Sequence, residues 1–190
     1  MSKFLDKVQP KNKKQLKQLI DYAFKHNIYD LNFIDTSKIT DMSNLLMNCE
    51  YDIDVSNWDV SNVINMGCTF YNCNMFTGKG LENWDVSNVT NMSDMFYYCK
   101  KFDCDLSHWN VSNVTDTSVM FYYCYDFDSD LSNWNVSNVK DMSYMFTVCE
   151  NFKGKGLENW DVSKVEDMKY MFGGCDKVSI PSWYKLYHRK

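Results

Sequence analysis

One phrase recurs five times in this chain, and its spacing restricts the fold more than any other feature. It reads Trp-Asp/Asn-Val-Ser-Asn/Lys-Val, followed by a Phe twelve positions after the Trp and by a Cys three positions further on. A fixed period of about 25 residues is typical of a column of repeated coils, because a propeller blade needs about 40 residues and a helical-pair repeat more than about 30. The tryptophans that open the copies are 25 or 26 residues apart: Trp58, Trp84, Trp109, Trp134 and Trp160.

The residues within one copy indicate how a coil is built, counting the Trp as position 0. Val at +2 and +5 favours a short strand. The residue at +7 is always Asp or Asn, the preference of a helix N-cap. Met at +8 and +11, Phe at +12 and Cys at +15 would lie on one face of a two-turn helix. The sequence therefore predicts coils of one strand and one short helix, with a degenerate first copy at Ile34 and a broken last copy at Trp183.

Cysteines follow the same period. Free Cys is among the most buried residue types, so a shared repeat position predicts a ladder of buried thiols. Helices of neighbouring coils would lie about 8–10 Å apart, farther than the ~7 Å that a disulfide tolerates, so we expect these thiols to be reduced. Cys68 and Cys104 lie outside the ladder and are expected to be more accessible. The ladder consists of Cys49, Cys73, Cys99, Cys124, Cys149 and Cys175.

The chain should form one domain, residues 1–190, in three parts. Residues 1–30 are predicted to hold a capping helix, which begins after Asn12 and presents one apolar stripe: Leu16, Leu19, Ile20, Ala23 and Phe24. Such a helix would cover the apolar end of the first coil. Residues 31–175 hold about six repeats, and residues 176–190 form a partial repeat or cap.

Charge is distributed unevenly along the sequence. Residues 1–30 carry a net charge of +4 and residues 176–190 carry +3. Because the net charge of the whole chain is −5, residues 31–175 carry −12. An acidic body repels phosphate, which argues against nucleic-acid binding through the main surface. No apolar stretch approaches the ~20 residues of a membrane span, and the first residues do not resemble a signal peptide. We therefore expect a cytoplasmic protein, or a cell-surface protein if a leader was removed.

The repeated phrase also resembles a known family. The string Trp-Asp-Val-Ser-Asn-Val-Thr-Asn-Met-Ser-x-Met-Phe-x-x-Cys is similar to the repeat of the bacterial surface antigen A-like (BspA-like) leucine-rich-repeat proteins, also found in mycoplasma lipoproteins. The Phe-x-x-Cys element is similar to the treponemal subclass of these repeats. The resemblance covers residues 31–183 and implies a right-handed α/β solenoid, with strands on one side and short helices on the other. Members are often surface-anchored and associated with adhesion.

The sequence predicts no catalytic residues, metal ligands or cofactor. His26, His108 and His188 share no repeat position, and none has a partner that the sequence brings near. Cys68 and Cys104 could act as nucleophiles only with a lowered pKa. Zinc is disfavoured because no His pair completes the four ligands that a cysteine pair such as Cys68 and Cys73, or Cys99 and Cys104, would begin. A weak calcium site competes with a solvated acidic edge at Asp103, Asp105, Asp126, Asp128 and Asp130.

Binding is the function that remains, because solenoids present extended surfaces. One candidate surface holds tyrosines, which are enriched at protein interfaces; the alternative is that they shield seams between coils. Its members are Tyr71, Tyr97, Tyr98, Tyr122, Tyr123, Tyr144 and Tyr170. The other is the row at +1, which could instead be a structural turn: Asp59, Asp85, Asn110, Asn135 and Asp161.

The sequence thus predicts a non-enzymatic protein-binding module whose partner is a protein of unknown identity. Two alternatives stay open. One is a surface adhesin of the BspA-like type whose leader is missing here. The other is a structural or self-assembling repeat protein, which concentration-dependent oligomers would favour.

Overall fold

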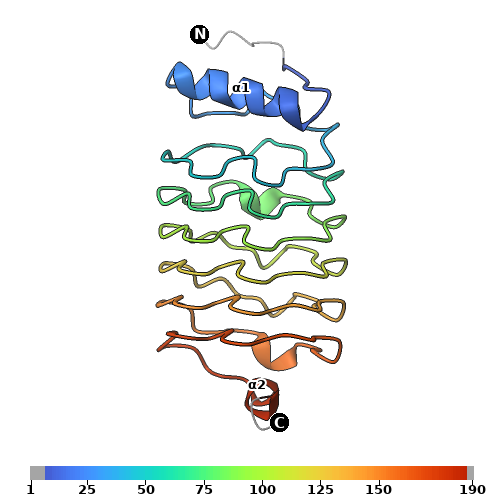
Figure 1. Ribbon diagram of the computed structural model, residues 1–190, viewed down its shortest axis with the longest axis vertical. Helices are drawn as coiled ribbons and strands as arrows, with labels where there is room; N and C mark the ends of the chain where they lie inside the picture. The colour runs from blue at the N-terminus through green and yellow to red at the C-terminus, as the bar shows by residue number, and fades with distance from the viewer. Residues whose placement is uncertain (1–6, 188–190) are drawn as a thin grey trace.

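The computed structural model describes residues 7–187 as a column of stacked coils (Figure 1). Helix α1, Lys13–Lys25, lies across the N-terminal end, and the short helix α2, Ser182–Tyr187, lies at the other end. Two 3-10 helices, η1 (Leu81–Asn83) and η2 (Leu157–Asn159), complete the helical elements of this described part. Turns and irregular chain make up the rest, and β-pairing between residues 7 and 187 is limited to isolated bridges. No helix in that range has the length and apolar composition to cross a bilayer.

Main-chain hydrogen bonds hold the coils in register. Amides at +8, +10, +12 and +14 donate to carbonyls at +7, +9, +11 and +13 of the next coil; Met92, for example, donates to Asp116 over 2.9 Å. These bonds set the coils at about the 4.8 Å spacing of neighbouring β-strands, and all four rows of amides point toward the C-terminal end. Parallel bridges join the +7 residues of successive coils: Asp41, Asn65, Asn91, Asp116, Asp141 and Asp167.

The strand and short helix expected in each coil are not formed, and that prediction is wrong. Residues at +10 and +14 have positive φ, for example Asp94 (54°) and Tyr98 (59°), whereas an α-helix needs negative φ throughout. Consecutive four-residue turns replace it, so that the amide of Met95 donates to the carbonyl of Met92. Each turn brings one apolar side chain inward after three or four residues, which imitates the spacing of a helical face.

The Asp or Asn at +7 accepts a backbone amide as expected, but in a turn and not at a helix cap. Oδ1 of Asn91 accepts from the amide of Ser93 over 2.8 Å, and the five other coils repeat this bond. An Asx turn of this kind supplies the local acceptor that a turning backbone lacks.

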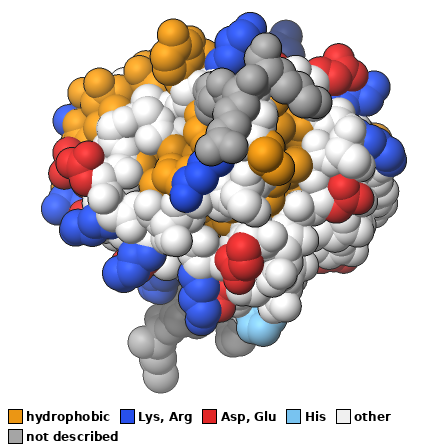
Figure 2. Space-filling view, turned by 90° about the horizontal axis from the view of Figure 1, so that it is seen from below, with side chains coloured by type: hydrophobic (Ala, Val, Ile, Leu, Met, Phe, Trp, Pro, Cys, Tyr) orange, Lys and Arg blue, Asp and Glu red, His pale blue; other side chains and the backbone are white. Residues whose placement is uncertain are grey.

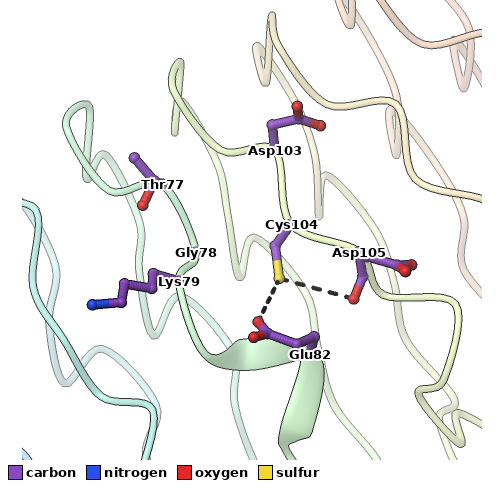
Figure 3. A pocket seen from close by; sticks show the side chains of 7 residues that line it. All are labelled: Thr77, Gly78, Lys79, Glu82, Asp103, Cys104 and Asp105. Atoms are coloured by element: carbon purple, nitrogen blue, oxygen red, sulfur yellow. Dashed lines mark hydrogen bonds between the residues drawn. The ribbon is translucent and has the colours of Figure 1, made fainter.

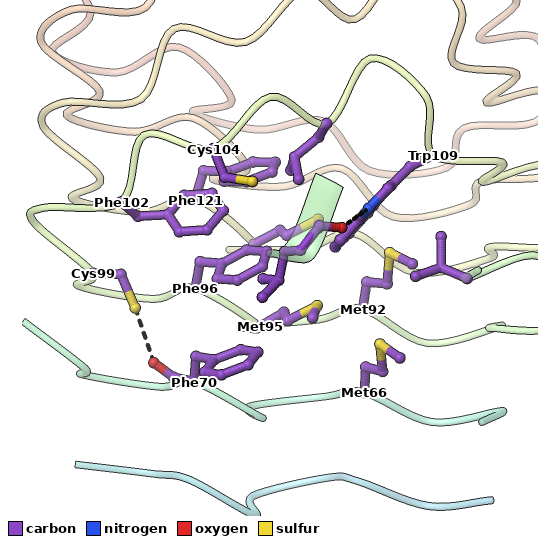
Figure 4. Close-up of a cluster of buried hydrophobic side chains, with 14 of the residues drawn as sticks. Met66, Phe70, Met92, Met95, Phe96, Cys99, Phe102, Cys104, Trp109 and Phe121 are labelled. Atoms are coloured by element: carbon purple, nitrogen blue, oxygen red, sulfur yellow. Dashed lines mark hydrogen bonds between the residues drawn. The ribbon is translucent and has the colours of Figure 1, made fainter. Parts of the chain in front are cut away.

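Buried rings form a continuous ladder along the column. Phe96 is fully buried, and its ring centroid lies 5.6 Å from those of both Phe70 and Phe121 (Figure 4). All five predicted tryptophans are buried. Each indole N–H donates to a main-chain carbonyl of the preceding coil, as from Trp109 to Leu81 over 2.8 Å. The tryptophan ladder therefore joins coils through both packing and hydrogen bonds.

The cysteine ladder is confirmed as a set of unpaired thiols, although the spacing expected between coils was wrong. Coils lie at β-strand distance and not at helix distance, so separation does not explain the absence of disulfides. Instead the five thiols after the first donate to the +12 carbonyl of the preceding coil, as from Cys99 to Phe70 over 2.9 Å (Figure 4). The first, Cys49, donates to the carbonyl of Tyr51. Two expectations about exposure are wrong. Cys175 was expected to be buried but is half-buried, and Cys104 was expected to be accessible but is buried.

Thiol labelling should separate these positions. Burial raises the pKa of the Cys99 and Cys124 thiols, which lowers the fraction of each that is thiolate at a given pH. The half-buried Cys68 and Cys175 should react with iodoacetamide first. The fully buried Cys99 and Cys124 should react at least about a hundredfold more slowly, because the reagent has little access to them and a smaller fraction of each thiol is ionised. Peptide mass spectrometry of native protein measures these rates, with urea-unfolded protein as the control. Equal rates at all positions would contradict the ladder.

Helix α1 caps the column as predicted. Asn12 is its N-cap, and its side chain accepts from the amide of Gln15 over 3.0 Å. Leu16, Ile20 and Ala23 are buried against the first coil, while Leu19 and Phe24 are partly buried. Lys13 reaches from the helix to the side chains of Asp41 and Ser43. The division of the chain into a cap, repeats and a terminal partial repeat otherwise stays a prediction.

The two glycine linkers have a geometric role. Gly80 and Gly156 immediately precede η1 and η2 with φ of 91° and 92°, a left-handed region that favours glycine. A Cβ on Gly156 would lie 2.3 Å from the Cα of Ser132 in the preceding coil. Close contact between coils therefore requires glycine here.

Candidate binding surfaces

The structure brings the seven predicted tyrosines into one connected surface, named here the tyrosine ladder. The rings of Tyr97 and Tyr71 stack at 4.3 Å, and those of Tyr97 and Tyr122 at 5.1 Å. Tyr144 continues the series from Tyr122 at 6.4 Å. The remaining contacts are Tyr97–Tyr98, Tyr98–Tyr123, Tyr122–Tyr123 and Tyr144–Tyr170. Coil stacking thus turns tyrosines spaced about 25 residues apart into neighbours.

Local backbone geometry places these rings outside the core. Positive φ at +14 turns Tyr98 and Tyr123 outward from the turn that ends on the buried Cys. All members are half-buried or exposed. Partial burial, and then the neighbouring Tyr71, raise the pKa of Tyr97, so its hydroxyl stays protonated and can donate. The rings of Tyr71, Tyr97 and Tyr122 lie nearly parallel, with interplanar angles of 5° and 2°.

Sequence reasoning missed two members of this surface. Tyr125 lies 5.7 Å from Tyr123, and the ammonium of Lys100 lies 4.6 Å above the ring of Tyr98 and 5.8 Å from that of Tyr125. Each of these residue types is found at its repeat position in only one coil, so no periodic signal in the sequence marked them. A cation above an aromatic ring is attracted by its negative face, and Lys100 therefore adds positive charge at one margin of the ladder.

The second predicted surface, the +1 row, forms structural turns. Each of its five side chains accepts the amide of the Ser two residues later, as Asp85 does from Ser87 over 3.1 Å. The hydrogen bonds from Ser87 lower the pKa of Asp85, and those from Ser163 that of Asp161. The row is exposed, but one oxygen of each side chain already accepts a backbone amide, so it is the weaker binding candidate.

A neighbouring column of asparagines at +4 also joins the coils, and the sequence did not reveal its role. The side-chain amide of Asn88 donates to the carbonyl of Ser61 over 2.8 Å, and equivalent bonds start from Asn62, Asn113 and Asn138. The Asn of the repeated phrase is thus a link between coils.

Lysines of the glycine linkers neutralise part of the acidic edge. Lys153 pairs with Asp128, and Lys155 pairs with Asp130 of the preceding coil over 2.6 Å. The bond from Lys155, followed by those from Ser132, lowers the pKa of Asp130 to about 2. No group of three or more Asp, Glu, His or Cys within residues 7–187 is arranged to hold a metal ion.

A cavity of about 240 Å³ lies beside the first glycine linker, around Cys104 (Figure 3). The thiol donates to Glu82 over 3.6 Å, and Asp103 and Asp105 also line the cavity. Burial, and then the charge of Glu82, raise the pKa of Cys104 to about 12. The thiol is therefore protonated at neutral pH, and the cavity offers no activated nucleophile.

The two histidines among residues 7–187 lie on different parts of the column. Nδ1 of His26 lies 2.8 Å from the carbonyl oxygen of Tyr22 on α1. His108 is exposed just before Trp109 in the middle of the column, and His188 lies outside the described residues.

Residues 7–187 form stacked coils around a continuous ladder of buried rings, with few helices and no sheet. These features define a compact repeat protein. The chain belongs to the family described as "Mycoplasma protein of unknown function, DUF285", whose model matches residues 14–79 and 68–183. No curated protein and no solved structure matches it. The narrower resemblance to BspA-like leucine-rich repeats remains a prediction.

Proposed function

We propose that this protein is a non-enzymatic protein-binding module and that the tyrosine ladder is its binding surface. The observation that carries the proposal is the ladder itself: seven tyrosines from successive coils lie in contact on one surface, and all are half-buried or exposed. Tyrosine offers a large apolar area with a hydroxyl and has few rotatable bonds to immobilise on binding.

Stacking makes the surface well suited to binding. Rings held at 4.3 and 5.1 Å by their neighbours, as around Tyr97, have little rotamer freedom left to lose. Their supports are main-chain bonds between coils, so the surface is preorganised. The alternative role, shielding of the seams between coils, explains partial burial but leaves unexplained why the strongly exposed Tyr170 continues the series at 62% exposure.

The fold and location are proposed from related observations. The period of about 25 residues and the inward Leu, Val, Phe and Cys positions support a leucine-rich-repeat-like, right-handed solenoid of the BspA-like type, with turns in place of the helices. Eight unpaired cysteines support a reducing compartment such as the cytoplasm.

The test is affinity capture from an extract of the source cells, comparing wild type with a variant that carries Tyr97→Ser, Tyr98→Ser, Tyr122→Ser and Tyr123→Ser. Loss of clustered tyrosines should lower recovery of the specific partner at least about tenfold, because interface tyrosines commonly contribute more than ~1 kcal/mol each. Quantitative mass spectrometry measures the recovery.

Tyr22→Ser is the matched control, because Tyr22 is 59% exposed on α1 and lies outside the ladder. Both variants must retain the circular dichroism spectrum of the wild type. Equal recovery of every captured protein by the fourfold variant and the wild type would overturn the assignment of the ladder.

A further inference from the structure

Two neighbouring members of the cysteine ladder differ in their access to solvent. Cys149 is fully buried, whereas Cys175, in the last coil, is half-buried. Cys175 follows Gly173 and Gly174, at positions where the preceding coils have larger side chains. Figure 2 looks at this end of the column and shows hydrophobic side chains, the class that includes cysteine, at the surface near the middle of the face. A small reagent can therefore reach Cys175 from solvent, but not Cys149.

Backbone pairing brings these two cysteines close together. The amide of Val148 donates to the carbonyl of Gly173 over 2.7 Å, so the segments that carry the two cysteines pair as neighbouring parallel strands do. Such strands lie about 4.8 Å apart, which is within the Cα separation of about 4.4–6.8 Å that a disulfide tolerates. Cys149 and Cys175 occupy the same repeat position in these two coils, and the backbone therefore allows a bond between them.

One carbonyl fixes the direction in which the Cys175 side chain points. The carbonyl of Phe146 accepts the amide of Cys149 over 3.0 Å and the thiol of Cys175 over 2.6 Å. The sulfur of Cys175 is thus directed back toward the coil that holds Cys149, and the two thiols are hydrogen-bonded to each other. A bond between the two sulfurs needs only a small movement of the last coil.

The two thiols differ in acidity. A hydrogen bond from Cys149 lowers the pKa of Cys175, although partial burial and the carboxylate of Asp176 oppose this effect. Burial, and then the bond to Cys175, raise the pKa of Cys149. Among the eight cysteines, all of which lie within residues 7–187, Cys175 alone has a lowered pKa. The thiolate, which is the form that attacks a disulfide, is therefore most favoured at Cys175.

We propose that Cys149 and Cys175 form a thiol–disulfide exchange site that reacts with low-molecular-weight disulfides such as oxidised glutathione. The Cys175 thiolate attacks one sulfur of the reagent, so that a mixed disulfide forms and one glutathione thiolate leaves. Cys149 then gives up its proton and attacks the sulfur of Cys175, which expels the second glutathione thiolate. The two departing thiolates take up the two protons that the cysteines lose. The cysteines are oxidised to one disulfide, and the reagent is reduced to two thiols.

The resulting bond joins the last two coils covalently and is reversible. One of its sulfurs, that of Cys175, belongs to a half-buried residue and stays within reach of an attacking thiol. Exposed disulfides are the ones that reducing thiols open most readily. The site thus responds to the ratio of oxidised to reduced thiols around the protein.

Peptide mapping of the full chain tests this site. The protein is incubated with oxidised glutathione, its remaining thiols are blocked with N-ethylmaleimide, and its peptides are analysed by mass spectrometry. The bond between Cys149 and Cys175 should form at least about tenfold faster than a bond between any other two cysteines. Dithiothreitol should restore both thiols. A bond between Cys49 and Cys73 that formed at the same rate would overturn the proposal.

Cys149→Ser separates the two chemical steps. Serine keeps a hydrogen-bond donor but cannot attack the mixed disulfide, so glutathione should stay attached to Cys175 in this variant and be displaced in the wild type. Cys99→Ser is the matched control, because Cys99 is an equally buried ladder member two coils before Cys149. The bond between Cys149 and Cys175 should form there within about twofold of the wild-type rate. Both variants must retain the circular dichroism spectrum of the wild type.

Cys68 provides a reference within the same molecule. It is half-buried like Cys175, but burial and then Asp94 raise its pKa, so it should take up glutathione at least about tenfold more slowly than Cys175. Equal rates at the two positions would contradict the site. Glutathione that remained on Cys175 of the wild-type protein, or a disulfide-linked dimer on a non-reducing gel in place of the internal bond, would do so as well.

Discussion

Phe121→Ala should lower the stability of the protein by about 3–5 kcal/mol, the range for truncating a buried Phe. Phe121 is fully buried at the centre of the ring ladder. Its centroid lies 4.1 Å from that of Phe127 and 5.6 Å from those of Phe96 and Phe146. Removal opens a cavity that main-chain bonds on both sides prevent from closing. Thermal unfolding followed by circular dichroism should show the melting temperature falling by roughly 10 °C.

Tyr170→Ala serves as its control, because this ring is 62% exposed and its removal opens no cavity. A change within about 0.5 kcal/mol is expected there. If Phe121→Ala melted at the same temperature as Tyr170→Ala, the rings would not form the core that stabilises the column.

Gly156→Ala should have the second large effect. The new Cβ would lie 2.3 Å from both the amide nitrogen and the Cα of Ser132, and the φ of 92° is unfavourable for alanine. Backbone strain and overpacking together should cost roughly 2–5 kcal/mol. Urea denaturation would measure the loss as a lower midpoint.

Gly173→Ala is the matched substitution in the last coil. Its φ is not in the positive range, and the nearest atom to the added Cβ is the carbonyl oxygen of Tyr170 at 3.4 Å, an ordinary contact. Near-wild-type stability is expected. A Gly156→Ala protein as stable as Gly173→Ala would show that the coils can separate at the linker without cost.

A feature of the fold could be predicted from the sequence when the residues that produce it recur at the same repeat position. The period of the Trp and Cys positions determined the column, because only stacked coils bury the same position in each repeat. The capping helix was predictable from Asn12 and a single apolar stripe. In contrast, spacing by three and four residues is shared by a helix and by a series of turns, and only positive φ at residues such as Asp94 separates the two.

The candidate surfaces followed the same rule. Contacts among the tyrosines at +10, +13 and +14 were predictable because repeat positions become spatial neighbours. The roles of Tyr125 and Lys100, each particular to one coil, were not. Asp85 illustrates a further limit, since a polar residue has the same sequence signature whether it faces a partner or accepts its own backbone amide.

The tryptophan bonds have a consequence for how the chain is made. The carbonyl of Leu81 accepts a second hydrogen bond from the indole of Trp109, and that of Leu106 from the indole of Trp134, each 28 residues further along the chain. On the ribosome the seam between two coils therefore stays incomplete until the tryptophan that opens the following coil has emerged. Folding is expected to trail synthesis by about one repeat and to proceed from the α1 end, with Trp183, bonded to Leu157, completing the last seam.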